Sequence, residues 1–104
     1  MTTFDDREAA FESKFAHDEE MQFRAEARRN KLTGLWAAGL MGLTGGAATD
    51  YAMTVVQADF EQAGHEDVVR KLAADLGDKT TPDTIRAKLA ELLPVAKAQL
   101  MSEV

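Results

Sequence analysis

Few residues in this sequence could do chemistry. There are two histidines, His17 and His65, which lie 48 positions apart, and there is no cysteine. Neither histidine has a second histidine at helical spacing, and the lack of cysteine excludes a disulfide scaffold and a thiolate site. The glycines match no phosphate-binding loop, and the carboxylates are scattered. We therefore predict a protein that is not an enzyme and holds no metal or cofactor.

One cluster of positive charge stands out. Residues 21–49 carry one acidic side chain and four basic ones, which are Arg24, Arg28, Arg29 and Lys31. Arg24 and Arg28 share a helical face, and Trp36 follows Arg29 by about two helical turns. Arginines beside an aromatic ring could hold an adenine nucleotide weakly. The alternative, which we prefer, is a solvated basic face that pairs with acids such as Glu20.

The first 20 residues combine negative charge with aromatic rings. They carry seven acidic and two basic residues, and they include three of the five phenylalanines, Phe4, Phe11 and Phe15. At about 100° per residue, Phe11 lies about 20° behind Phe4 and Phe15 about 20° ahead of it. As a helix, this segment would present one narrow aromatic stripe.

Two interpretations of this stripe remain open. It could pack on the protein's own core and extend the first helix, or it could stay partly unfolded and enter a groove of a partner as a helix. A stripe of three rings is too narrow to hold an isolated helix in water. The acidic run over residues 18–20 also separates the segment from the core-forming part of the chain.

Length and charge limit the class of protein. With 104 residues and 45% apolar content, the chain suits one domain with a modest core. A net charge of −6 disfavours nucleic acid and anionic membrane surfaces as partners. The charged N-terminus does not resemble a signal peptide, and no apolar run is long enough to span a bilayer. We expect a cytoplasmic protein that is monomeric when free and does not insert into the membrane.

The spacing of apolar residues is helical throughout and lacks the alternation typical of strands. It predicts helices over roughly residues 21–42, 48–63, 66–76 and 82–101. Glycines mark the breaks, at Gly45-Gly46, at Gly64 and from Gly77 onward, with Gly77 ending the third helix. Thr81 is expected to cap the last helix and Pro82 to open it. We expect Pro94 to kink that helix rather than to end it near Leu93.

Each predicted helix carries an apolar stripe for a common core. The expected core residues are Leu32, Leu35, Trp36 and Leu40 in the first helix, Ala52, Val55, Val56, Phe60 and Ala63 in the second, Val68, Val69, Leu72 and Leu76 in the third, and Ile85, Leu89, Leu92, Leu93, Ala96 and Leu100 in the fourth. Short connections favour antiparallel neighbours. The predicted fold is all-α, a four-helix bundle over residues 21–104 preceded by a flexible, potentially helical segment over residues 1–20.

Several runs of the sequence resemble the zeta-type ATPase inhibitor family of alphaproteobacteria, once catalogued as a domain of unknown function. They are MTTFDDRE (1–8), FAHDEE (15–20), AEARRNKL (25–32), KLAADL (71–76) and TIRAKL (84–89). The resemblance spans nearly the whole chain, and it implies a four-helix layout. Two features depart from the family pattern, Pro94 and the glycine-rich turn at residues 45–48.

The resemblance implies an inhibitor of the F-type ATP synthase. In such an inhibitor, the N-terminal segment becomes helical and enters an interface between the α and β subunits of the catalytic head, where it stops the rotor from turning in the direction of hydrolysis. The implied partner is therefore the head with its rotor, at the cytosolic face of the membrane. The implied contact residues are Phe4, Asp5, Asp6, Arg7, Glu8, Phe11, Glu12, Lys14, Phe15 and His17.

Overall fold

A computed structural model describes the backbone of residues 3–61 and 65–103 and the side chains of residues 19–58 and 65–103. It contains four α-helices and one short 3₁₀ helix, and the described residues form no strand. The elements are α1 (Thr3–Leu40), α2 (Gly45–Glu61), α3 (Glu66–Leu76), η1 (Gly77–Lys79) and α4 (Pro82–Glu103). The predicted all-α class with four helices is confirmed.

Helix α1 is much longer than the predicted first helix. It begins at Thr3 rather than near residue 21 and ends at Leu40. Acidic residues such as those at 18–20 lower helix propensity only slightly, so they do not interrupt it. Residues 3–20 are thus helical, the form that the sequence allowed for them, while their flexibility in solution stays a prediction.

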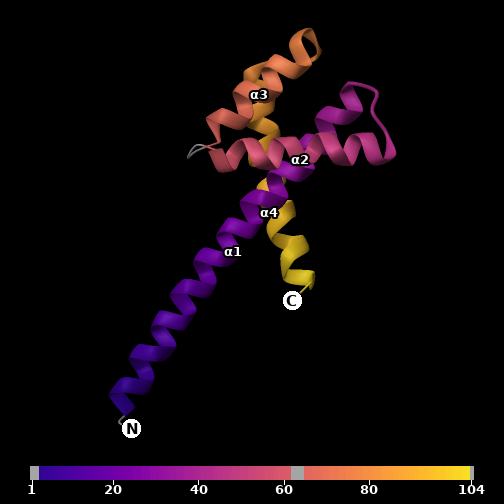
Figure 1. The fold of residues 1–104 in the computed structure, drawn as a ribbon. Helices are drawn as coiled ribbons and strands as arrows, with labels where there is room; N and C mark the ends of the chain where they lie inside the picture. Colours follow the sequence, from indigo (N-terminus) through magenta and orange to yellow (C-terminus); the bar gives the residue numbers. More distant parts are fainter. Residues whose placement is uncertain (1–2, 62–64, 104) are drawn as a thin grey trace.

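The helices are arranged around the C-terminal half of α1 (Figure 1). Helix α2 lies across α1, and α3 and α4 complete the bundle. The N-terminal half of α1 runs away from the other helices. As a result, the molecule extends 62 Å along its longest axis and only 25 and 21 Å along the other two.

The core lies where α2, α3 and α4 meet the C-terminal half of α1. Among its fully buried side chains are Val55, Val68, Leu72 and Ile85. The stripes predicted for these three helices are largely confirmed, with Leu92 and Leu93 only half-buried. Phe60 and Ala63, also predicted for the core, lie outside the residues whose side chains are described.

The predicted core stripe of the first helix is mostly wrong, although Trp36 does pack against the core. Leu32, Leu35 and Trp36 are only half-buried and Leu40 is exposed. The α1 residues that are buried are instead mostly small or polar, namely Ala25, Arg29, Asn30, Thr33, Gly34, Ala37 and Ala38. Small side chains let the backbones of neighbouring helices approach closely, and that approach decides which face of α1 turns inward.

Gly34 marks the closest approach of α1 to α2. A Cβ atom at this position would lie 2.8 Å from the Cα atom of Ala52 and 3.1 Å from Cγ2 of Val55. These distances are shorter than van der Waals contact, so only glycine fits here without movement of a helix. By contrast, a Cβ atom at Gly39 would meet nothing within 4 Å.

The helix ends follow the predicted signals closely. Gly77 has a positive φ of 54° and caps α3 by donating its N–H to the carbonyl of Ala73. The Thr81 hydroxyl accepts the backbone N–H of Thr84 at 3.2 Å, and Pro82 opens α4. Helix α4 continues through Pro94 to Glu103 rather than ending near Leu93.

The first break lies slightly earlier than predicted. The chain turns over residues 41–44, where Gly42 has a φ of 80°, and Gly45 already belongs to α2. The break predicted at Gly64 falls outside the described residues.

Candidate functional site

All ten predicted partner-contact residues lie on the first half of α1. This half, residues 3–20, is called the arm below. At about 1.5 Å per residue, the arm is roughly 27 Å long. Helical spacing places Phe4, Phe11 and Phe15 within about 40° of one another around its axis. The side chains of residues 3–18 are outside the described set, so the stripe rests on the helical backbone and the sequence.

A contact between the middle of α1 and the end of α4 lies near the base of the arm. Arg28 of α1 donates to both carboxylate oxygens of Glu103, at 2.8 and 2.9 Å, and to Gln99 at 3.1 Å. This two-point contact raises the pKa of Arg28 and lowers the pKa of Glu103 below its ordinary value. It ties the last turn of α4 to α1 just where the arm leaves the bundle.

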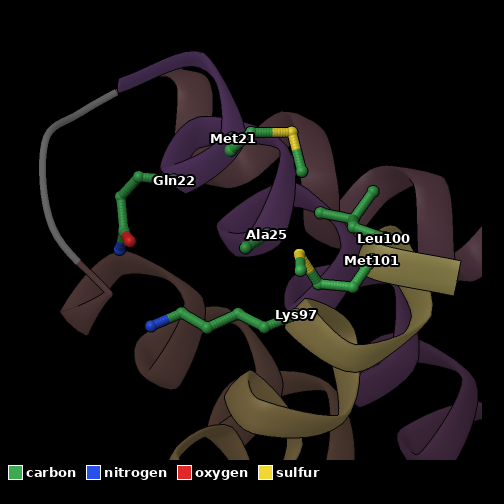
Figure 2. Close-up of a pocket in the computed structure, with 6 residues that line it drawn as sticks. All are labelled: Met21, Gln22, Ala25, Lys97, Leu100 and Met101. Atoms are coloured by element: carbon green, nitrogen blue, oxygen red, sulfur yellow. The ribbon is translucent and has the colours of Figure 1, made fainter. Parts of the chain in front are cut away.

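An apolar groove lies beside this contact, between α1 and the end of α4 (Figure 2). Its volume is about 320 Å³, and it is lined by Met21, Gln22, Ala25, Lys97, Leu100 and Met101. In Figure 2, the side chains of Gln22 and Lys97 end on the same side, away from Leu100. The groove therefore combines an apolar floor with a polar rim.

The structure brings together only three of the five predicted nucleotide-binding residues. Arg24 pairs with Glu20, and Arg24, Arg28 and Lys31 line a second groove with Phe23 and Met53. Arg29 is instead buried and donates to the side-chain oxygen of Asn30. The Trp36 ring faces Lys88, whose Nζ lies 5.5 Å from the ring centroid.

Arg24 and Arg28 pair with Glu20 and Glu103, as the sequence analysis preferred for a solvated basic face, whereas the buried Arg29 does not belong to such a face. Trp36 does not line the groove of Arg24 and Arg28. Stacking on Trp36 and phosphate contacts to those arginines would therefore belong to two separate places. No observation favours a nucleotide site built from this set.

The described residues offer little for metal or membrane binding. Among them, no three histidine, aspartate or glutamate side chains are grouped so that they could hold a metal ion. His65 lies 3.3 Å from the Glu66 carboxylate, and the His17 side chain is outside the described set. None of the helices, as far as they are described, has both the length and the apolar character needed to cross a membrane.

The groove at the base of the arm was missed in the sequence analysis. Its walls come from residues that are more than 70 positions apart, and local periodicity says nothing about which ends of two helices meet. A weak signal does exist, because Met21 and Ala25 lie four residues apart and Leu100 and Met101 give the end of α4 an apolar edge.

Comparisons with known proteins agree with this architecture. A solved chain, described as the solution NMR structure of a protein, is 58% identical in sequence and superimposes with a TM-score of 0.75. The match covers 81% of this chain and 99% of that one. No curated protein matches the chain. The model of the family described as ATPase inhibitor subunit zeta matches residues 1–99, nearly the full length. The chain therefore belongs to the ATPase inhibitor subunit zeta family.

Proposed function

We propose that this protein stops ATP hydrolysis by the F-type ATP synthase by inserting its arm, as a helix, between an α and a β subunit of the catalytic head. Membership of an inhibitor family supports a regulatory rather than a catalytic role. The observation that carries the proposal is the arm itself, a helix of roughly 27 Å that continues α1 beyond the bundle (Figure 1). A helix held out in this way is shaped to enter a cleft.

The aromatic stripe would supply most of the binding energy. Phe4, Phe11 and Phe15 are large apolar anchors, and each is worth about 2 kcal/mol or more if it is well buried in an interface. The charged residues around them, such as Asp5, Arg7 and Lys14, would affect orientation and association rate more than affinity. Ordering the arm costs roughly 2–5 kcal/mol of this energy, which favours reversible inhibition.

The bundle would act as a stop. An α-helix with its side chains is about 10–12 Å wide, whereas the molecule measures 25 by 21 Å across its two shorter axes. A cleft that admits the arm therefore excludes the bundle. With the arm inserted and the bundle outside, the rotor could not turn in the direction of hydrolysis. The complex would lie at the cytosolic face of the membrane that holds the synthase.

A pair of substitutions in the arm tests the aromatic stripe. Phe11→Ala removes one anchor, and Ser13→Ala changes a residue that lies about 180° from Phe4 around the helix. We expect Phe11→Ala to raise the inhibitor concentration for half-maximal inhibition by roughly tenfold or more. Ser13→Ala should leave that concentration nearly unchanged, because its position faces away from the stripe.

Thermal unfolding of the free protein separates the two interpretations of the stripe. If the rings anchor the protein to a partner, Phe11→Ala will leave the unfolding midpoint close to that of the wild type. A large fall in the midpoint would show that Phe11 packs on the protein's own core. Equal inhibition by Phe11→Ala and the wild type would contradict the proposal directly.

A further inference from the structure

The apolar groove at the base of the arm is poorly covered by the protein itself. Leu100 forms its buried floor, whereas Met101 at its edge is 72% exposed, more than the other large apolar side chains of the described chain. Met21 is half-buried on the α1 side. Exposed apolar surface of this kind beside a polar rim is typical of a protein contact.

The groove adjoins the face of α1 that carries the aromatic stripe, and its apolar residues Ala25 and Met21 lie about 60° and 100° to one side of that stripe. Gln22, which lines the groove, follows Phe4 by 18 residues. At about 100° per residue this is five whole turns, so Gln22 lies in line with the stripe. A partner surface that covers Phe11 and Phe15 therefore reaches the groove when it is followed along the helix towards the bundle.

The ion pair at the end of α4 holds the groove in shape. Arg28 binds both oxygens of Glu103, two residues beyond Met101. Because this contact joins the last turn of α4 to α1, the two walls of the groove already lie together before a partner arrives. A preformed site loses less conformational entropy on binding than one that must first be ordered.

The charge at the rim indicates the chemistry of the occupant. Lys97 is exposed, and no carboxylate of the described residues pairs with it. By contrast, the nearby Arg24 and Arg28 already pair with Glu20 and Glu103. An apolar side chain flanked by a carboxylate would fill the floor and meet the Lys97 ammonium.

We propose that this groove is a second contact with the catalytic head, made by the bundle, and that it receives an apolar side chain beside a carboxylate from the rim of the cleft that the arm enters. This inference rests on the proposed function. The contact would hold the inserted arm at a fixed depth and slow its release, because the arm and the α1 wall of the groove lie on the same continuous helix once the arm is ordered.

A charged residue in the groove tests the contact in the full-length protein. Met101→Glu and Val95→Glu each place one added negative charge at an exposed apolar position of α4, but Val95 does not line the groove. We expect Met101→Glu to weaken inhibition of purified ATPase by about tenfold or more and to speed recovery after dilution. Val95→Glu should inhibit as the wild type does.

Charge reversal at the rim provides a second, independent test. Lys97→Glu reverses the charge beside the groove, and Lys79→Glu makes the same change in η1, at the opposite end of α4. We expect Lys97→Glu to weaken inhibition most at low salt, where rim charges act most strongly. Both lysines are exposed, so this pair remains informative even if Met101→Glu lowers the unfolding midpoint.

The possible failures can be told apart. If Phe11→Ala weakens inhibition while Met101→Glu and Lys97→Glu inhibit as their controls do, the groove proposal is wrong but the proposed insertion of the arm is still supported. If Phe11→Ala inhibits as well as the wild type, the proposed insertion of the arm is wrong, and the groove proposal loses its basis with it. Weakening by Val95→Glu and Lys79→Glu as strong as that by their partners would also overturn the groove proposal, because added negative charge alone would then explain the effect.

Discussion

Gly34→Ala should destabilise the bundle, although alanine is the better helix former. The new Cβ atom would lie 2.8 Å from the Cα atom of Ala52 and 3.2 Å from its Cβ atom. Both are part of or next to the α2 backbone, which cannot move as a side chain does. Overpacking of this kind typically costs about 1–3 kcal/mol, because α1 and α2 must move apart.

Gly39→Ala is the matched control for this prediction. It also lies in α1, has no positive φ, and its added Cβ atom would meet nothing within 4 Å. In a helix, glycine to alanine gains up to about 1 kcal/mol in propensity. Comparing the two variants largely cancels that gain, so Gly34→Ala should be less stable than Gly39→Ala by roughly 1–3 kcal/mol.

Thermal unfolding by circular dichroism measures this difference. For a domain near 100 residues, 1 kcal/mol shifts the midpoint by about 4–8 °C. We expect Gly34→Ala to unfold below the wild type and Gly39→Ala to unfold at or above it. If Gly34→Ala raised the midpoint as much as Gly39→Ala does, the close contact of α1 with α2 would be refuted.

Two further substitutions test single contacts by the same assay. Thr81→Ala removes the cap on the N–H of Thr84 and should cost about 1 kcal/mol; an unchanged midpoint would argue against the cap. Tyr51→Phe removes a 2.7 Å hydrogen bond to Asp75 and should cost about 1 kcal/mol. Burial raises the pKa of Asp75, but Tyr51 and Lys71 together lower it below its ordinary value. The stability that this carboxylate contributes is therefore lost as pH falls below about 4, and Tyr51→Phe should make that loss smaller; identical pH profiles would contradict this.

The sequence predicted the helices that carry large apolar side chains. Val68, Val69, Leu72 and Leu76 recur at helical spacing between clear end signals, so both the extent of α3 and its buried face follow from local pattern. The ends of α4 are equally local, because a capping hydroxyl and a proline act on their own turn of helix.

The buried face of α1 could not be predicted in the same way. Periodicity gives weight to large residues such as Leu35 and Trp36, whereas the packed face uses Gly34, Ala37 and Ala38. Small residues indicate a buried helix face only when the neighbouring helix is known, because they act by allowing two backbones to approach closely. For residues 3–20 the sequence predicted a flexible segment that could become helical, and it placed the start of the first core helix near residue 21. It did not predict that both parts form the one continuous helix α1.

The candidate site also has one part that follows from local pattern and one that depends on tertiary packing. The aromatic stripe needs only the helical repeat, so Phe4, Phe11 and Phe15 could be placed on one face from the sequence. The groove depends on the end of α4 meeting α1, and the Arg28–Glu103 pair that holds it joins residues 75 positions apart. Contacts of that range follow from tertiary packing and not from local pattern.

Removal of the arm is the most direct test of the account. The full-length protein and a variant that lacks residues 1–19 would be added to purified F-type ATPase, and the rate of ATP hydrolysis would be followed over a range of inhibitor concentrations. Because the bundle core is built from residues beyond the arm, the variant should still show a cooperative thermal transition. We expect a folded variant that has lost nearly all inhibition. A folded variant that inhibits as strongly as the full-length protein would contradict the insertion of the arm.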